Sequence, residues 1–341
     1  MEQRLIDTTL GLVRARLEVD DWAGAARILE ELHPPDQADV FSELHPEQQE
    51  SLLPRLPAED AADILEELED EEAAELASRL SLETLTSILD EMESDEAADL
   101  LGDLEPEQAS QILSRLEDAE EIRPLLLHPD ETAGGLMTSE FIALRRNMTV
   151  AQALTAVREW AQELEAVHYL FVVDRENRLC GVTSLLDLIK AAPDQRLSEI
   201  MIPDVITVHT DADQEECAQL MSRYDLFALP VVDEGNHLIG VITVDDLVDV
   251  LVEEQSEDIQ RLGGSLPLER PYLDTPVWQV AWKRVGWLLL LFITETLTGT
   301  VLRHFEHELS VEVALAFFIP LLIGTGGNAG SQTAATLIRS L

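Results

Sequence analysis

Apolar residues recur with a period of 12 through the N-terminal third of the chain. The recurring position carries Leu or Met, at Leu32, Leu44, Leu56, Leu68, Leu80, Met92, Leu104 and Leu116. Twelve residues accommodate one helix of about two turns and a tight connection. Such a short helix cannot bury its apolar face alone, so the units are expected to stack into a superhelix. Residues 1–130 are therefore predicted to form an acidic, all-α helical-repeat domain, an architecture typical of docking surfaces.

A second pattern occurs twice after the repeats. The copy at 137–190 contains FVVDRENRLCGVTSLLDLI, and the copy at 201–252 contains PVVDEGNHLIGVITVDDLV. Each copy predicts an extended opening, a helix, two short strands around an Asp/Gly/Asn turn, and a closing helix. Corresponding positions include Ser184 with Thr243 and Asp187 with Asp246. Residues 131–252 thus resemble an α/β tandem pair of CBS domains.

The remaining third of the chain changes from charged to apolar. An acidic pattern at 245–262 predicts a helix that begins a connector, 245–275, in which Gly263 and Gly264 end the helix. A partial α-helical membrane domain is expected at 276–341, with spans at about 284–303 and 312–341. Basic residues are concentrated before the first span, so the positive-inside rule places residues 1 to about 275 in the cytoplasm.

The charge balance excludes some partners. A formal net charge of −46 disfavours nucleic acid and acidic substrates and favours cations. Salt adaptation is an alternative explanation, because Lys occurs only at 190 and 283. The sequence contains no phosphate-binding loop, nucleophile elbow or catalytic metal motif, so no enzymatic activity is expected.

The order of these segments, with AGGLMT at 133–138 and PLLIGTGGNAGSQTAAT at 320–336, resembles the MgtE family of magnesium transporters. The last motif is the most specific. Its glycines permit close helix approach or local unwinding beside a pore, and two amides four residues apart share a helix face. A helix-packing motif of small residues is the alternative. The expected pore residues are Gly324, Gly326, Gly327, Asn328 and Gln332.

The resemblance implies a homodimer in the cell (inner) membrane, multi-pass, with five membrane helices per subunit and a pore on the dimer axis. Two spans are visible here, so the sequence is interpreted as a C-terminally truncated piece. The implied activity is a channel or transporter that moves Mg²⁺ down its electrochemical gradient and is gated by cytosolic Mg²⁺. Pore ligands are expected to grip a hydrated ion, because Mg²⁺ sheds its waters reluctantly.

The family resemblance also implies a set of Mg²⁺-sensing carboxylates between the repeats, the second CBS copy and the connector. Facing carboxylates repel one another, and divalent ions remove the repulsion and bridge the two surfaces. A solvated acidic face is the alternative for any single member. The matching positions are Asp63, Asp95, Asp99, Asp213, Glu215, Asp225, Asp246, Asp249, Glu254, Glu257 and Asp258.

CBS pairs commonly bind adenine nucleotides through a Ser/Thr-x-x-Asp motif whose Asp holds the ribose. In the first copy the resemblance assigns Ser184 and Asp187 to this role and places Tyr169 against the base. Leu186 occupies a position that is often basic, so adenosine-like binding is a safer expectation than ATP. A pair serving only as a dimer interface is the alternative.

Two other functions compete with transport. One is a membrane-anchored CBS scaffold that senses nucleotide without transporting an ion. The other is an enzyme regulated by CBS domains, which is remote because every segment already has an assignment.

Overall fold

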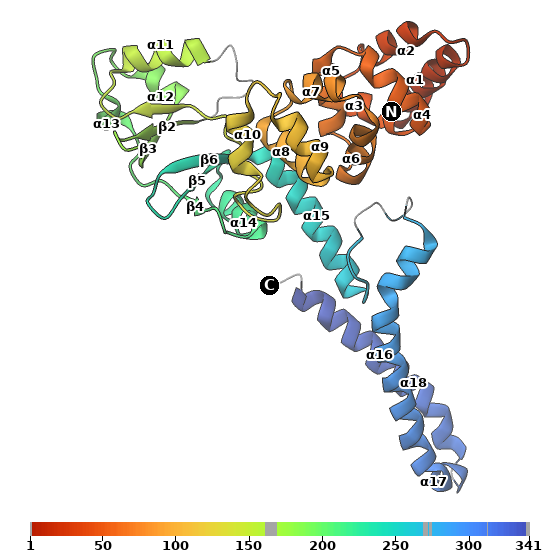
Figure 1. Ribbon diagram of the computed structural model, residues 1–341. Helices are drawn as coiled ribbons and strands as arrows, with labels where there is room; N and C mark the ends of the chain where they lie inside the picture. Colours follow the sequence, from red (N-terminus) through yellow and green to blue (C-terminus); the bar gives the residue numbers. More distant parts are fainter. Residues whose placement is uncertain (1, 161–168, 269–271, 273–274, 312, 339–341) are drawn as a thin grey trace. The chain divides into compact units, whose positions relative to one another are not determined.

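The computed structural model describes residues 2–160, 169–268, 272, 275–311 and 313–338 (Figure 1). It divides into two compact units, Met1–Val252 and Glu253–Leu341. The first unit contains short helices followed by two small sheets, and the second consists of helices. The predicted fold class, helical repeats followed by a CBS pair and an apolar helical segment, is confirmed.

The N-terminal region contains ten α-helices among its described residues. They are α1 (Glu2–Leu17), α2 (Trp22–Leu29), α3 (Pro34–Ser42), α4 (Pro46–Leu52), α5 (Ala58–Glu66), α6 (Asp70–Arg79), α7 (Leu82–Leu89), α8 (Ser94–Asp103), α9 (Pro106–Leu113) and α10 (Ala119–Leu125), with a 3₁₀ turn η1 (Leu53–Arg55) after α4. From α2 to α9 each helix begins 12 residues after the one before it. Each predicted 12-residue repeat therefore corresponds to one helix.

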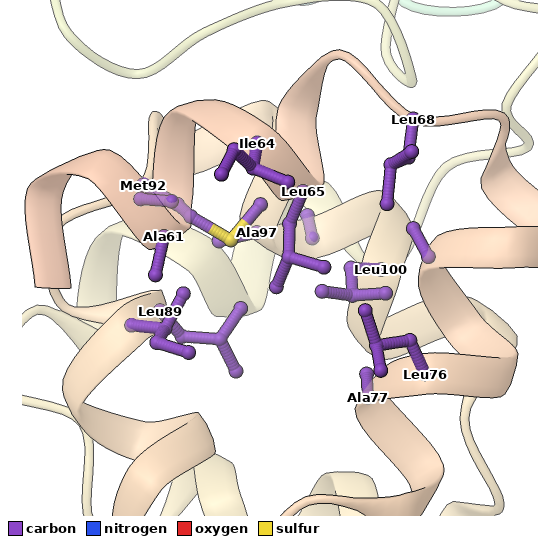
Figure 2. Packing of buried hydrophobic residues seen from close by; sticks show 14 of the residues in the cluster. Ala61, Ile64, Leu65, Leu68, Leu76, Ala77, Leu89, Met92, Ala97 and Leu100 are labelled. Atoms are coloured by element: carbon purple, nitrogen blue, oxygen red, sulfur yellow. The ribbon is translucent and has the colours of Figure 1, made fainter. Parts of the chain in front are cut away.

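Alternate helices pack together, so the repeats form two rows. Helix α3 contacts α5 and α5 contacts α7, while α4 contacts α6 and α6 contacts α8. The periodic apolar residues lie between the rows, where Ile64, Leu65, Leu89 and Leu100 are buried (Figure 2). Proline at the first position of α3, α4 and α9 sets the chain direction at each turn, because its missing N–H would be unpaired there anyway.

Each CBS copy contains a three-stranded sheet of the same topology. In the first copy β1 (Ala143–Arg145) pairs in parallel with β2 (Tyr169–Val173), which pairs antiparallel with β3 (Leu179–Ser184). The second copy repeats this order with β4 (Val208–His209), β5 (Ala228–Val232) and β6 (Leu238–Thr243). The helices are α11 (Val150–Trp160), α12 (Leu185–Lys190) and α13 (Leu197–Ile200) in the first copy, with α14 (Gln214–Tyr224) and the start of α15 (Val244–Leu262) in the second.

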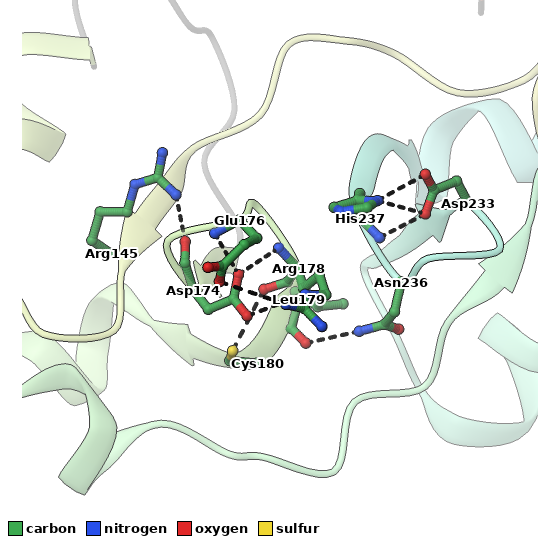
Figure 3. Close-up of polar contacts among 9 residues, drawn as sticks. All are labelled: Arg145, Asp174, Glu176, Arg178, Leu179, Cys180, Asp233, Asn236 and His237. Atoms are coloured by element: carbon green, nitrogen blue, oxygen red, sulfur yellow. Dashed lines mark hydrogen bonds and ion pairs between the residues drawn. The ribbon is translucent and has the colours of Figure 1, made fainter.

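The hairpin turns of the two copies bind each other (Figure 3). The Asn236 side chain donates to the Leu179 carbonyl over 3.0 Å, and the Leu179 N–H donates back to the Asn236 carbonyl over 3.0 Å. Asn177 and Asn236 both have positive φ, which asparagine tolerates better than most residues. The predicted Asp/Gly/Asn turns thus join the two copies.

Three clusters of buried side chains hold the first unit together. One lies within the first CBS copy, and a second contains Phe171 and Val241 from the two sheets. The largest extends from the helical repeats through Met137 to Leu229 and Ile242 of the second copy. The repeats and the second CBS copy therefore share a hydrophobic core.

The second unit contains the end of α15, then α16 (Val277–His304), α17 (Glu306–Val311) and α18 (Val313–Ile338). The connector turns at Gly264, whose φ is +70° and whose added Cβ would lie 2.2 Å from Cδ1 of Trp287. Among the described residues, one helix, α16, is long and apolar enough to cross a membrane. The second predicted span coincides with the helix α18 and stays a prediction.

The shared periodic core leads to a prediction about stability. Leu89→Ala should lower the free energy of unfolding by about 2–5 kcal/mol, because Leu89 is buried between helix rows and the deletion leaves a cavity. Leu127→Ala is the matched control, since that side chain is 79% exposed and should change stability by less than about 0.5 kcal/mol. Guanidinium unfolding of residues 1–262, followed by circular dichroism, measures both. Equal losses in the two variants would contradict the packing described above.

Candidate metal-sensing site

Helix α8 presents acidic residues on one side and buries its other side. Ala97, Ala98 and Leu101 are in the core. Asp95, Asp99 and Asp103 are spaced by four residues, so they follow one another along a single helix face. The amphipathic pattern of α8 therefore orients its carboxylates as soon as its apolar residues are buried.

Asp246 follows β6 and is held by the Thr-x-x-Asp motif of the second CBS copy. The Thr243 hydroxyl donates to Asp246 Oδ2 over 2.6 Å, and the Thr243 N–H donates to the same oxygen over 3.2 Å. Burial raises the pKa of Asp246, and the hydrogen bonds from Thr243 act in the opposite direction. The carboxylate is thus fixed at the start of α15.

The segment that connects the helical repeats to the CBS pair holds α8 beside β6. Gly135 allows a tight turn there, because a Cβ would lie 2.5 Å from the Pro129 carbonyl oxygen. Thr138 and Val241 then exchange two main-chain hydrogen bonds, of 2.9 and 3.0 Å, which attach the segment to β6. The AGGLMT motif therefore forms the joint between the helical repeats and the second CBS copy.

Asp95 is the most buried acid at this joint. Only 6% of its surface is exposed, and its Oδ1 has no hydrogen-bond partner among the described residues. Burial raises its pKa well above the ordinary value, and the charge of Asp246 raises it further. A buried acceptor left without a donor or cation costs about 1–3 kcal/mol. The site is therefore destabilised when it holds neither protons nor cations.

The pKa values of three neighbouring acids on and beside α8 are also raised. Burial and the charges of Asp95 and Asp99 raise the pKa of Glu96 to about 9. Burial raises the pKa of Glu93 to about 7, with Glu66 as its strongest charged neighbour. Asp99 also rises to a pKa of about 7, through burial and then the charge of Asp130. Glu93 and Asp99 keep exposed surface, so water screens their repulsion more than at Asp95.

This acidic cluster fits a hydrated cation better than a dry metal cage. Within the described ranges, no three His, Cys, Asp or Glu side chains form a ready-made metal site. Mg²⁺ prefers oxygen ligands and usually keeps several waters, so it can link carboxylates that do not touch each other. Asp95 Oδ1 is a buried oxygen of the kind that a cation or one of its waters satisfies.

Of the predicted metal ligands, the structure brings Asp95, Asp99 and Asp246 within electrostatic reach of one another. Other predicted ligands have different local roles. Asp213 caps α14 by accepting from the Glu215 N–H over 2.9 Å, and Asp225 ends that helix in the left-handed conformation.

The remaining predicted ligands stay predictions. Asp63 is half-buried on α5, and the side chain of Asp249 lies outside what the structure describes. Glu254, Glu257 and Asp258 belong to the second unit, where Glu257 pairs with Arg261 over 2.5 Å.

Sequence reasoning missed several acids of the cluster, namely Glu66, Glu93, Glu96 and Glu140. The acid-rich run ESDEAADLLGD was a visible signal for the two on either side of Asp95. Glu66 and Glu140 gave no such signal, because they approach α8 only through the packing of other segments.

The predicted nucleotide motif lies at the end of the first CBS sheet. Tyr169 and Ser184 face each other in the β2–β3 register. The Ser184 hydroxyl donates to Asp187 Oδ2 over 2.6 Å, and the Asp187 N–H donates to Ser184 Oγ over 3.1 Å. The hydroxyl–carboxylate hydrogen bond matches that between Thr243 and Asp246, whereas the main-chain hydrogen bond differs, since in the second copy the Thr243 N–H donates to the carboxylate. Leu186 is exposed beside the first motif.

The predicted pore residues Gly324, Gly326, Gly327, Asn328 and Gln332 all lie within α18. The helix continues through the glycines without a break, so the local unwinding that the sequence permits is not seen. Asn328 and Gln332 share a helix face, as their spacing predicts.

Comparison with protein families assigns both halves of the first unit. Residues 25–131 match the MgtE intracellular N domain, and residues 133–194 and 197–253 match CBS domains. The solved cytosolic domain of the Mg²⁺ channel MgtE in complex with ATP is 40% identical to this chain. It aligns over 70% of this chain and 98% of its own length, with a TM-score of 0.66.

Two full-length relatives point to the same family. The magnesium transporter MgtE of Thermus thermophilus is 46% identical over 65% of this chain, and that of Bacillus subtilis is 36% identical over 66%. In both alignments 49% of the relative is covered, so the chain spans about half the length of these proteins. From the family matches and the shared cytosolic fold together, the chain belongs to the MgtE family of magnesium transporters.

Proposed function

We propose that this chain contains the Mg²⁺-sensing region and the first membrane helices of a Mg²⁺-selective channel or transporter subunit. The observation that carries the proposal is the buried Asp95 carboxylate, whose Oδ1 lacks a partner among the described residues and whose pKa is raised further by the charge of Asp246 from another domain. The naming of relatives as magnesium transporters supports the identity of the ion. The complete subunit would move Mg²⁺ down its electrochemical gradient.

Sensing follows from the balance between packing and repulsion. The shared core holds α8 against the second CBS copy, while the carboxylates there repel one another. At low Mg²⁺ the repulsion favours separation of the two domains. At high Mg²⁺ the ion and its waters occupy the acidic cluster and favour the docked state. The shift can be no larger than the ion's preference for that state.

The connector and membrane helices take the remaining roles. Glu254, Glu257 and Asp258 lie on α15 between the CBS pair and α16 in the sequence, so they are assigned to coupling occupancy to the pore. Gly324, Gly326, Gly327, Asn328 and Gln332 of α18 are assigned to the permeation path. The subunit acts as a homodimer in the cell membrane, with residues 1 to about 275 in the cytoplasm.

A nucleotide site in the first CBS copy is the second part of the proposal. A relative's cytosolic domain was solved with ATP, and the Ser184–Asp187 hydrogen bond orients a carboxylate at the end of β3. Asp187 would hold the ribose hydroxyls and Tyr169 would stack on the base. Asp246 has the same motif geometry but faces the acidic cluster, so it is assigned to Mg²⁺.

Asp95→Asn and Asp246→Asn should each weaken the response to Mg²⁺. In residues 1–262, millimolar Mg²⁺ is expected to lower the radius of gyration measured by small-angle scattering at constant ionic strength. Each variant loses one anionic ligand, so the midpoint should rise by more than about tenfold. Asp211→Asn, at an exposed acid outside the cluster, should behave like the parent.

Equal compaction by Na⁺, or a parent fragment whose size does not change, would contradict Mg²⁺ sensing. The acidic charge would then reflect salt adaptation, and the membrane-anchored nucleotide-sensing scaffold would become the better assignment.

The raised pKa values predict that the response depends on pH. Between about pH 5 and pH 9 the docked state binds more protons than the separated state, so docking without Mg²⁺ weakens as the pH rises. Mg²⁺ must displace these protons, so its midpoint should fall several-fold from about pH 6.5 to about pH 8.5. Glu96→Gln removes an acid whose pKa is raised to about 9 and should flatten this dependence. The same scattering titration measures it, and a midpoint that rises with pH would be the opposite of this expectation.

Asp187→Ala should abolish binding of ATP and AMP, while Asp246→Ala should leave most of it. The reason is that the two aspartates accept the same hydroxyl hydrogen bond but have different assignments, ribose for one and Mg²⁺ for the other. Isothermal calorimetry on residues 1–262 in Mg²⁺-free buffer distinguishes them, with circular dichroism to verify folding. Equal losses in both variants would reject the division of roles.

A further inference from the structure

The hydroxyl of Ser94 is the centre of a buried hydrogen-bond cluster beside the carboxylates. Ser94 and Thr138 are 4% and 5% exposed, and their hydroxyl oxygens lie 3.1 Å apart. Ser139 donates to Ser94 Oγ twice, from its N–H over 3.2 Å and from its hydroxyl over 3.0 Å. We refer to Ser94, Thr138, Ser139 and Glu140 as the Ser94 junction.

The hydrogen-bonding capacity of Ser94 is fully used. A serine hydroxyl has one hydrogen to donate and two lone pairs that accept. Ser139 provides two donors, so both lone pairs are occupied and the hydroxyl hydrogen of Ser94 must point to Thr138 Oγ1. Removing this one oxygen would leave the half-buried Ser139 N–H and hydroxyl without this acceptor and would take one of its partners from the buried Thr138 Oγ1.

The junction also caps the first turn of α8. The Ser94 N–H donates to Glu140 Oε1 over 3.2 Å, and the Glu93 N–H donates to Glu66 Oε1 over 2.9 Å. Glu93 is the N-cap residue, and its own side chain makes no capping hydrogen bond. Carboxylates from outside the helix therefore satisfy N–H groups that a helix start leaves unpaired.

A continuous path leads from the junction to Asp246. Ser94 is the neighbour of Asp95 in the chain, and it contacts Thr138. Thr138 is joined to Val241 by two main-chain hydrogen bonds, and Val241 lies on β6 two residues before Thr243. Thr243 holds the Asp246 carboxylate. Ser94 and Thr138 are 44 residues apart in the sequence, and Thr138 and Val241 are about 100 residues apart. Contacts between these distant segments thereby set the separation of Asp95 and Asp246.

We propose that Ser94 is a positioning residue of the acidic cluster, whose hydroxyl fixes α8 on the 138–140 segment so that Asp95 faces Asp246. Ser94 is not itself a metal ligand. This inference rests on the proposed Mg²⁺-sensing function and names the contact through which the two domains are held in register.

The test is hydrogen–deuterium exchange of the 341-residue chain in detergent micelles, titrated with Mg²⁺. In Ser94→Ala the amides of 138–141 and 241 should exchange roughly tenfold faster without Mg²⁺, because Ser139 loses an acceptor for two donors and the buried Thr138 hydroxyl loses one partner. The Mg²⁺ midpoint for protecting these amides should rise several-fold, while amides of α2 and α3 stay as in the parent. Ser114→Ala removes an exposed serine hydroxyl from the same domain and should change neither quantity.

If Ser94→Ala disturbs the whole domain, two further variants still test the positioning role of Ser94. Ser94→Thr retains the hydroxyl and should lie nearer the parent than Ser94→Ala. Ser139→Ala removes one of the two donors and should raise the Mg²⁺ midpoint by a smaller factor. An unchanged midpoint in Ser139→Ala, or in a folded Ser94→Ala, would overturn the positioning role.

The same titration separates the role of Ser94 from Mg²⁺ sensing by the chain. A parent chain whose amides show no Mg²⁺-dependent protection would overturn Mg²⁺ sensing, and the positioning role with it. A parent that responds, beside a Ser94→Ala variant with the same midpoint, would overturn only the role of Ser94.

Discussion

The hydrophobic core shared by the helical repeats and the second CBS copy is the constraint on which the first unit depends. Met137 reaches β6 so closely that Gly240 has no room for a Cβ, which would lie 2.4 Å from the Met137 sulfur. Burial of apolar surface in this core opposes the repulsion between acids at its edge. Because the same contacts bury Asp95, the repulsion cannot be relieved by moving one side chain. It can be relieved by protons, by cations, or by separating the domains.

The response to an ion that we propose would thus be a property of the joint rather than of a coordination cage. The N–H groups at the start of α8 are capped by two further carboxylates, those of Glu66 and Glu140. Charge therefore accumulates where water is partly excluded and Coulomb interactions are stronger than at the surface. A weak, hydrated bridge suits sensing of millimolar Mg²⁺, since a permanent site would remain filled at every cytosolic concentration.

The duplicated CBS copies show how one motif obtains two environments. Ser184–Asp187 and Thr243–Asp246 have the same 2.6 Å hydroxyl–carboxylate hydrogen bond. The first copy has its own core, whereas the second shares its core with the helical repeats. Asp246 consequently lies near the acids of α8, and burial raises its pKa. The difference between the copies comes from what packs on them and not from the motif.

The sequence by itself determined the local architecture. The 12-residue period predicted one short helix per repeat, as found from α2 to α9, and the paired Asp/Gly/Asn turns predicted the two hairpins. These features depend on neighbours within a few residues, so they can be read along the chain. Family resemblance also predicted Asp95, Asp99 and Asp246 as Mg²⁺ ligands; the structure brings them within electrostatic reach of one another, and their role as ligands stays a prediction. Only the tertiary structure decided that Glu96 and Glu140 join them and that Ser94 holds the joint, while Asp213 and Asp225 serve as helix ends. Those roles depend on segments far apart in sequence, whose approach is set by packing of the shared core.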